Sequence, residues 1–223
     1  MDTSGNLFGT TSLAGSSGSL GHIFRLAAGG GLTRLDVLGG NCQGAMVIEG
    51  GSNLIGIDRT GGAFGLGSIF RLNAGSEFPT ILHSFNGSDG REFFGDLIMD
   101  AAGNLFGTSR RGGAFDQGTI FRLDTSGVFT VLHVFDGFNG ALPEGGLVAD
   151  AAGNLFGTTT GGGAASAGAG TIFRLSGAGF VTGGAVIPET ATWALLIAGF
   201  GLVGAGLRAR RRKQADARDA VEA

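Results

Sequence analysis

Three histidines are the side chains in this sequence best suited to acid–base chemistry or metal binding. His83 and His133 lie 50 residues apart, and His22 lies in an earlier segment. A metal or catalytic site brings several such groups together in one place. Histidines that recur at one repeat position are more simply explained by the repeated architecture, so we expect them to be structural. The single cysteine, Cys42, allows neither an intrachain disulfide nor a cysteine-based metal site.

Carboxylates and guanidinium groups also recur at regular intervals. Asp100 and Asp150 open the same phrase, DAAGNLFGT, and one column of arginines consists of Arg25, Arg71, Arg122 and Arg174. Paired carboxylates at a suitable separation hydrolyse glycosidic bonds, and a ring of carboxylates and guanidinium groups could bind glycans. We favour the alternative that each Asp caps a hairpin and each Arg pairs with a neighbouring repeat, because buried charges need partners.

Two glycine-rich turns contain oxygen ligands of the kind that calcium prefers. They are NGSDG at 86–90 and DGFNG at 136–140, and neither matches the loop pattern of an EF-hand. We interpret both as hairpin turns. The sequence also contains no HExxH, GxSxG or phosphate-binding loop. We therefore expect no metal site, no cofactor and no catalytic residue.

The composition favours a β-rich protein. The chain has 223 residues, with 47 Gly, 18 Phe, no Tyr and only 3 Pro. Glycine without a strict triplet period excludes collagen, and the many apolar residues between the glycines argue against a disordered linker. Residues 1–190 carry a net charge of about −6 and residues 191–223 about +3. An acidic body makes nucleic-acid binding improbable, since phosphate contacts need a basic surface.

The chain repeats itself with a period of about 50 residues. One aligned column contains Asn6, Asn53, Asn104 and Asn154, and a second contains Phe24, Phe70, Phe121 and Phe173. In the most regular unit, turn residues separate four apolar segments: DLIMD (96–100), NLFGTS (104–109), GTIFRL (118–123) and FTVLHVF (129–135). Each segment has the length of a strand.

Four antiparallel strands in a unit of this size are typical of a β-propeller blade. The sequence therefore predicts an all-β fold in residues 1–176, with about three and a half blades. They are a partial blade (2–38), a diverged blade (47–85), a full blade (96–135) and an unfinished blade (146–175). A ring normally needs four to eight blades, so we expect the chain to lack blades at its amino-terminal end.

The repeated phrase GNLFGTT, followed by GTIFRL and TVLHVF, resembles the GloVer tandem repeat of bacterial choice-of-anchor surface proteins. The resemblance covers most of residues 1–176. It implies propeller-like blades that are exported and followed by a carboxyl-terminal anchor. The phrases NLIGID and LTRLDVLGGNCQG depart from the repeat.

The composition changes after a linker at 177–187. Residues 191–207 form an uncharged run of a length that can span a membrane with some adjustment. The segment 188–213 resembles the PEP-CTERM sorting signal, which an exosortase recognises in the inner membrane. The resemblance rests on Pro188, Glu189, Trp193, Arg208, Arg210, Arg211, Arg212 and Lys213. The basic end is expected to stay cytoplasmic, with the repeats outside. Thr190 and the polar tail at 214–223 depart from the pattern of the signal.

No secretory signal peptide is recognisable in residues 1–30. Together with the repeat that begins at residue 1, this suggests that the chain is an amino-terminally truncated product of a longer gene. We expect a non-enzymatic, surface-anchored or secreted protein with a structural or binding role in the extracellular matrix. Its expected partners are an exosortase, the inner membrane and exopolysaccharide or other surface glycans. The alternative is a propeller enzyme that acts on polysaccharide.

Overall fold

The computed structural model describes residues 1–11, 22–37, 46–76, 78–163 and 169–182. The chain divides into the units Met1–Thr182 and Gly183–Ala223, and all described residues belong to the first. These residues form strands, turns and loops without a helix, which confirms the all-β prediction for this part of the chain. The first unit reaches Thr182, beyond the expected boundary at 176.

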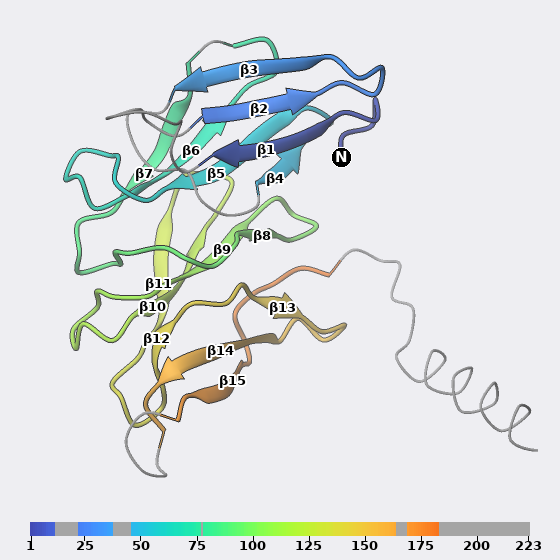
Figure 1. Ribbon diagram of the computed structural model, residues 1–223. Coiled ribbons are helices and arrows are strands. Elements are labelled where there is room, and N and C mark those ends of the chain that lie inside the picture. The colour runs from blue at the N-terminus through green and yellow to red at the C-terminus, as the bar shows by residue number, and fades with distance from the viewer. Residues whose placement is uncertain (12–21, 38–45, 77, 164–168, 183–223) are drawn as a thin grey trace, which may run out of the picture. The chain divides into compact units, whose positions relative to one another are not determined.

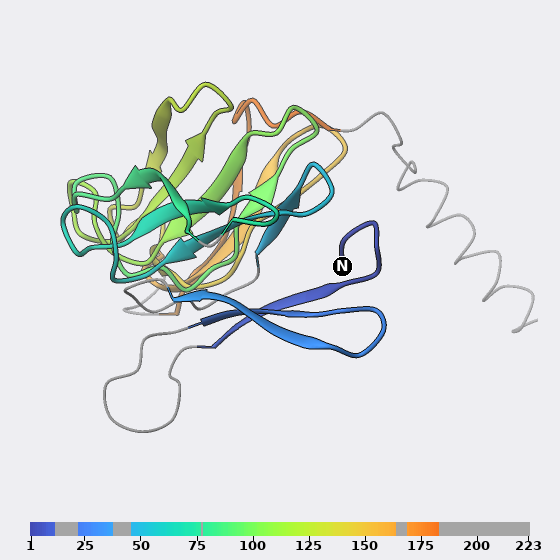
Figure 2. The ribbon, with the colours of Figure 1, turned by 90° about the horizontal axis from the view of Figure 1, so that it is seen from above.

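Four antiparallel sheets follow one another in chain order (Figure 1). The first sheet has the order β1-β2-β3, with β1 (Leu7–Thr11), β2 (His22–Leu26) and β3 (Leu32–Val37). In the view turned by 90°, the strands of this sheet can be seen apart from the other strands (Figure 2). The second sheet contains β4 (Val47–Glu49), β5 (Asn53–Asp58), β6 (Ser68–Leu72) and β7 (Thr80–Ser84). The divergent phrases NLIGID and LTRLDV thus form β5 and β3.

The third sheet is the regular blade that the sequence predicts. It contains β8 (Ile98–Met99), β9 (Leu105–Ser109), β10 (Thr119–Leu123) and β11 (Phe129–Val134). The fourth sheet contains β12 (Ala141–Pro143), β13 (Val148–Ala149), β14 (Leu155–Gly161) and β15 (Thr171–Leu175). It reaches four strands because β12 and β13 both pair with β14. The blade that we expected at 146–175 therefore also includes β12, which lies in the connection before it.

A glycine lies opposite the repeated phenylalanine in every sheet. The cross-strand pairs are Gly9 and Phe24, Gly56 and Phe70, Gly107 and Phe121, and Gly157 and Phe173. A Cβ atom on Gly107 would lie 2.6 Å from Cζ of Phe121, and the corresponding distances in the other three pairs are 2.4–2.8 Å. The absence of a side chain on the NLFGT strand therefore makes room for the aromatic ring, which explains why these two columns recur together.

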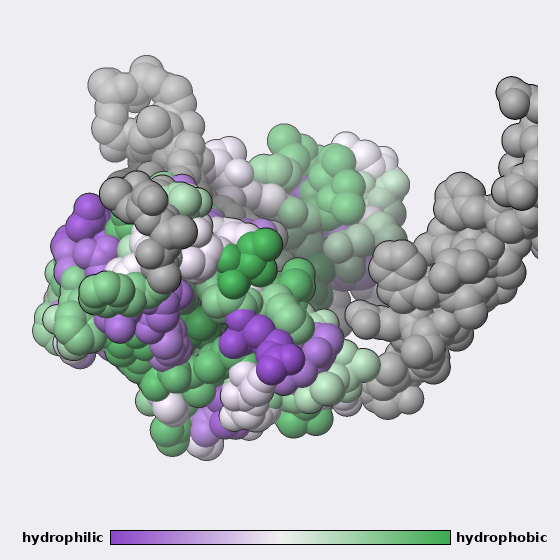
Figure 3. All heavy atoms as spheres, turned by 90° about the horizontal axis from the view of Figure 1, so that it is seen from below, coloured by the Kyte–Doolittle hydropathy of each residue, from purple (hydrophilic) through white to green (hydrophobic). Residues whose placement is uncertain are grey.

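Three apolar clusters join consecutive sheets. One buries Ile23 of the first sheet with Leu54 of the second. The next buries Ile69 with Leu105, and the third buries Ile120 with Leu155. At the end of the unit formed by the fourth sheet, hydrophobic residues are exposed among polar ones (Figure 3). Contacts between the sheets are thus made by the same pair of repeat positions each time.

Candidate functional site

The repeated Asp–Asn pair closes the turn that joins the first two strands of a blade. The Asp100 carboxylate accepts hydrogen bonds from the backbone N–H of Ala102 and of Asn104, at 2.9 and 2.8 Å. Its second oxygen accepts one from Nδ2 of Asn104 at 2.7 Å. Asp2 with Asn6 and Asp150 with Asn154 form the same type of turn. The aspartates thus cap hairpins, as we favoured from the sequence.

Two arginines of the repeated column, Arg71 and Arg122, make hydrogen bonds within their own sheet. Arg71 donates to Glu49 at 2.6 Å, and Glu49 replaces the repeated aspartate in the turn before Asn53. Arg122 donates to Oδ1 of Asn104 at 3.2 Å. The hydrogen-bond partners of Arg71 and Arg122 therefore belong to their own blades, whereas we expected partners in a neighbouring blade. The reason is that the facing strand of the same hairpin brings the turn within reach.

Asp100 is the most heavily engaged of these carboxylates. It is 5% exposed and accepts a further hydrogen bond from the backbone N–H of Val181 at 3.1 Å. Burial opposes ionisation, but the hydrogen bonds from Asn104, Val181 and Ala102 outweigh it and hold the pKa of Asp100 below its ordinary value. A lowered pKa in the folded state stabilises the protein above the unfolded pKa. This contribution is lost as the pH falls through the folded value.

Replacing Asp100 with alanine is expected to lower the free energy of unfolding by about 1–3 kcal/mol, because four donors lose their acceptor. Urea denaturation followed by far-ultraviolet circular dichroism measures the change. Asp150→Ala is the matched control, since Asp150 makes the same three turn bonds in a more exposed turn. Equal losses in the two variants would mean that the burial of Asp100 and its bond to Val181 add nothing.

Two of the histidines, His83 and His133, pack against aromatic rings. His83 stacks on Phe129 of the next sheet with ring centroids 3.9 Å apart, and its Nε2 lies 2.9 Å from Oδ2 of Asp89. His133 meets the edge of Phe135 at 4.8 Å. Among the described residues, no three metal-ligating side chains come together. These contacts fit the structural role that we expect for the histidines.

A cluster of charged and aromatic side chains lies in the loops beside the second and third sheets. We call it the rim cluster, and it consists of Arg59, Arg91, Glu92, Phe94, Arg110, Arg111, Asp116 and Glu144. These residues follow β5, β7, β9 and β12, and they are therefore brought together from four connections. Sequence comparison of the repeats did not identify the cluster.

Backbone pairing holds two of these loops together. The backbone N–H of Arg91 donates to the carbonyl of Arg111 at 2.9 Å, and the reverse bond is 3.0 Å. The backbone N–H of Arg110 donates to the carbonyl of Glu92 at 2.9 Å. In the fourth sheet the same bridge is formed by β12, where Ala141 faces Gly161. The backbone arrangement is thus repeated, but the fourth sheet has uncharged residues at these four positions, namely Ala141, Leu142, Thr160 and Gly161.

The ion pairs of the rim cluster form a network. Arg91 donates from Nε and Nη2 to both oxygens of Asp116, at 3.1 and 2.7 Å. Arg110 links two carboxylates, Glu92 at 2.9 Å and Glu144 at 2.7 Å. Arg111 lies 3.2 Å from Asp116 and 3.5 Å from Glu92. These ion pairs fix the positions of the guanidinium groups of Arg91, Arg110 and Arg111.

The electrostatics of the rim cluster favour its charged form. Hydrogen bonds from Arg91, supported by the backbone N–H of Gly112 and by Arg111, lower the pKa of Asp116 to about 2. Bonds to Asp116 raise the pKa of Arg91, and bonds to Glu144 and Glu92 raise that of Arg110. Burial lowers the pKa of Arg59. Because Asp116 titrates below its ordinary value of 3.8, its ion pairs persist at neutral pH and are lost only as the pH falls toward 2.

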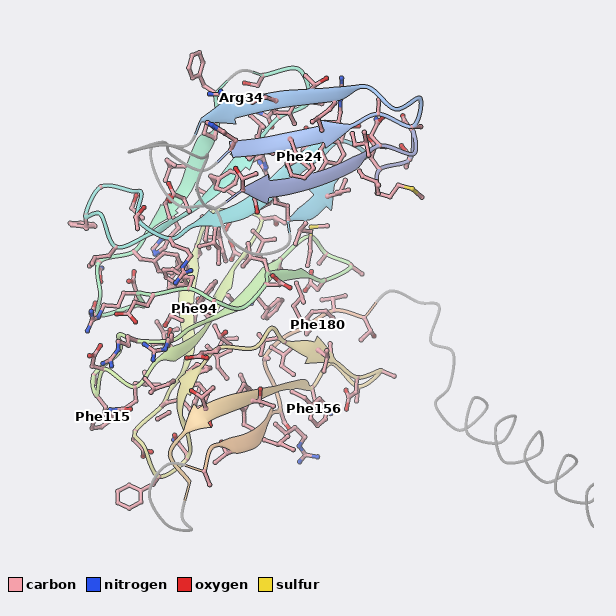
Figure 4. All side chains as sticks on the ribbon, in the orientation of Figure 1. Phe24, Arg34, Phe94, Phe115, Phe156 and Phe180 are labelled. Atoms are coloured by element: carbon pink, nitrogen blue, oxygen red, sulfur yellow. The ribbon has the colours of Figure 1, made fainter. Side chains whose placement is uncertain are left out.

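Exposed phenylalanines lie among these charges. The guanidinium of Arg59 lies 3.8 Å from the ring centre of Phe94, within the range of a cation–π contact. Phe94 is 44% exposed and Phe115 is 60% exposed. Figure 4 shows Phe94 and Phe115 toward the left of the view and Phe180 toward the right. Arginine donors beside open aromatic faces can bind carboxylates and flat apolar surfaces.

A cavity of about 440 Å³ lies between the first and second sheets. Its lining includes Asp2, Asn6, Arg25 and Arg34, and Asp2 and Asn6 are already engaged in a turn cap. The corresponding space between the third and fourth sheets is occupied by the chain itself. There the backbone N–H of Ala101 donates to the carbonyl of Val181 at 2.9 Å. Residues assigned to the linker at 177–187 thus pack on the blades as far as Thr182.

The predicted sorting residues, from Pro188 to Lys213, lie outside the described residues, as do the expected transmembrane run at 191–207 and the polar tail at 214–223. Within the described ranges, no helix is long and apolar enough to cross a membrane.

Solved structures share the fold of this chain. One, described as a nidogen/laminin complex, is 19% identical with a TM-score of 0.53, over 72% of this chain and 54% of that chain. Another, a luciferin-regenerating enzyme, is 15% identical with a TM-score of 0.53, over 82% and 61% of the two chains. The chain thus spans less than two thirds of either protein, and the likeness shows a propeller-like fold alone.

No curated protein matches the sequence. The model of one repeat family, the Gloeobacter/Verrucomicrobia repeat, matches residues 1–173, which is most of the part that the sequence shows to be repetitive. This match confirms the resemblance that we draw from the recurring phrase. The chain belongs to the Gloeobacter/Verrucomicrobia repeat family.

Proposed function

We propose that this chain is an exported, non-enzymatic repeat protein of the extracellular matrix, and that its rim cluster binds acidic polysaccharide. The observation that carries the proposal is the combination of four arginines and exposed phenylalanines in one repeat junction. The repeated polar columns, in contrast, are used within the turns of the blades. The unique part of the surface is therefore the part available for recognition.

Arg111 is the residue best placed to contact a ligand. Each guanidinium has five N–H donors, and Arg91 directs a fork of two at Asp116. The Arg111 guanidinium makes one hydrogen bond, to Asp116 at 3.2 Å, lies 3.5 Å from Glu92, and belongs to a side chain that is 36% exposed. A uronic-acid carboxylate can accept its remaining donors, while the rings of Phe94 and Phe115 pack against the apolar faces of sugar rings.

The same geometry favours binding over hydrolysis. A glycoside hydrolase needs a carboxylic acid that stays protonated near neutral pH. In the rim cluster, hydrogen bonds from Arg91 lower the pKa of Asp116 to about 2. The repeated Asp100 and Asp150 also have lowered pKa values, and their oxygens are engaged in turns. We therefore place the polysaccharide enzyme second.

The experiment compares Arg111→Ala with the wild-type chain in binding to alginate, a polyuronate, by isothermal titration calorimetry. We expect at least a tenfold loss of affinity, weakened wild-type binding at high salt and no binding to neutral dextran. Arg174→Ala is the matched control, because it removes the same charge from an exposed position on β15. An equal loss in both variants would indicate a general charge effect and contradict the rim site. Release of reducing ends from alginate would favour the enzyme.

The export part of the proposal depends on residues 188–213, which resemble an exosortase signal. We propose that residues 191–207 hold the chain in the inner membrane until an exosortase cleaves it near Pro188 and Glu189. The test is to express the chain behind a signal peptide, with and without an exosortase, and to follow its size. Glu189→Ala should block cleavage, and an uncleaved wild-type chain beside an active exosortase would oppose this part of the proposal.

A further inference from the structure

Two apolar columns of the repeat have one exception each, at opposite ends of the first unit. The leucine of the phrase NLF or NLI is buried at Leu54, Leu105 and Leu155, at 0–3% exposure, but Leu7 is 49% exposed. The isoleucine of IFRL is buried at Ile23, Ile69 and Ile120, at 0–1% exposure, but Ile172 is 84% exposed. The first sheet therefore exposes its leucine, and the fourth exposes its isoleucine.

The three junctions explain these exceptions. Every junction packs the isoleucine face of one sheet against the leucine face of the next, as in the cluster of Ile120 with Leu155. The same holds for Ile69 with Leu105 and for Ile23 with Leu54. One isoleucine face and one leucine face then remain uncovered within the described residues.

Each uncovered face is more than a single residue. On the fourth sheet, Val148 is 65% exposed, whereas its counterpart Ile98 packs in a junction. Phe156 of the same sheet is half-buried, and its counterpart Phe106 is completely buried. On the first sheet, Leu32 is 70% exposed, and its counterpart Phe129 packs in a junction. Both faces therefore present apolar side chains at positions that are covered in the other sheets.

We propose that these two faces bind each other in separate copies of the chain, so that the fourth sheet of one copy packs on the first sheet of the next. The occupant follows from the molecule, because the chain carries both halves of a contact that it already makes three times. The contact is head-to-tail, with a different surface on each copy. Such contacts produce closed rings or open chains of subunits.

The test uses two variants of the full chain, Ile172→Asp and Leu7→Asp, in a mild detergent that accommodates the apolar segment 191–207. Size-exclusion chromatography with light scattering measures the protein mass. Wild-type chains are expected to form assemblies whose mass grows with concentration. Each variant alone has lost one of the two faces and should be monomeric. An equimolar mixture should form a one-to-one dimer, because each variant retains the face that the other has lost.

Phe115→Asp is the control, since Phe115 is 60% exposed in the rim loops and belongs to neither face. It should assemble as the wild-type chain does. Circular dichroism must show that all variants are folded, and Leu32→Asp replaces Leu7→Asp if the first sheet is lost. A mixture that stays monomeric, a wild-type chain that stays monomeric at high concentration, or single variants that assemble normally would each overturn the proposal.

Discussion

Replacing Phe121 with alanine is expected to lower the free energy of unfolding by about 3–5 kcal/mol, the range for removing a buried aromatic side chain. Phe121 is completely buried. Its ring centre lies 5.3 Å from those of Phe85 and Phe129, and it faces the open backbone of Gly107. The substitution would leave a cavity at the junction of the second and third sheets. The loss of contacts therefore affects two blades at once.

Guanidinium denaturation followed by far-ultraviolet circular dichroism measures this change. The matched control is Phe115→Ala, because Phe115 is 60% exposed and its removal should alter stability by no more than about 0.5 kcal/mol. A loss of less than about 1 kcal/mol for Phe121→Ala would show that the junction can collapse around the missing ring. The repeated phenylalanine would then not be the main support of the blades.

Much of this fold could be predicted from the sequence because the signals are local. The phrase DAAGN contains a turn whose capping aspartate and asparagine lie four residues apart, and Asp100 and Asn104 bond as the turn chemistry suggests. Apolar segments between such turns form the strands. Periodicity and turn residues therefore define the hairpins without knowledge of distant contacts.

The rim cluster could not be predicted in the same way. Arg91 and Asp116 are 25 residues apart, and Arg110 and Glu144 are 34 residues apart. Their meeting depends on how successive sheets stack, which repeat spacing does not specify. Comparison of repeats also directs attention to residues that recur. The sequence feature that points to the cluster is instead a difference between repeats. Arg110 and Arg111 occupy positions at which the next repeat has Thr160 and Gly161.

The segment after β15 shows a second limit of prediction from the sequence. Its small residues are typical of a linker, yet Ala178 is 5% exposed and Phe180 contacts Phe106 with ring centres 5.1 Å apart. A glycine-rich sequence can be ordered when nearby blades offer a turn and an apolar surface to pair with. Composition alone does not reveal that surface.

Replacing Gly112 with alanine is expected to lower the free energy of unfolding by about 2–5 kcal/mol and to abolish alginate binding at the rim cluster. Gly112 has φ +94°, which costs an L-residue about 1–2 kcal/mol. A Cβ atom there would lie 2.5 Å from the carbonyl oxygen of Gly87 and 2.8 Å from Cα of Gly90. Relieving such a clash with backbone typically costs a further 1–3 kcal/mol.

The effect on binding follows from the position of these loops. Gly90 immediately precedes Arg91, and Gly112 immediately follows Arg111, so separating the loops breaks the backbone bridge between the two arginines. The backbone N–H of Gly112 also donates to Asp116 at 2.9 Å, and its displacement would loosen the carboxylate that positions Arg91. Chemical denaturation and calorimetry with alginate measure the two consequences separately.

Gly127→Ala is the matched control. Gly127 has φ +87°, but a Cβ atom there would meet nothing within 4 Å. This variant should incur only the backbone strain of about 1–2 kcal/mol and retain alginate binding. If Gly112→Ala costs no more than Gly127→Ala and still binds alginate, the loops can separate without disturbing the arginines. In that case the close approach of the two loops is not what organises the rim cluster.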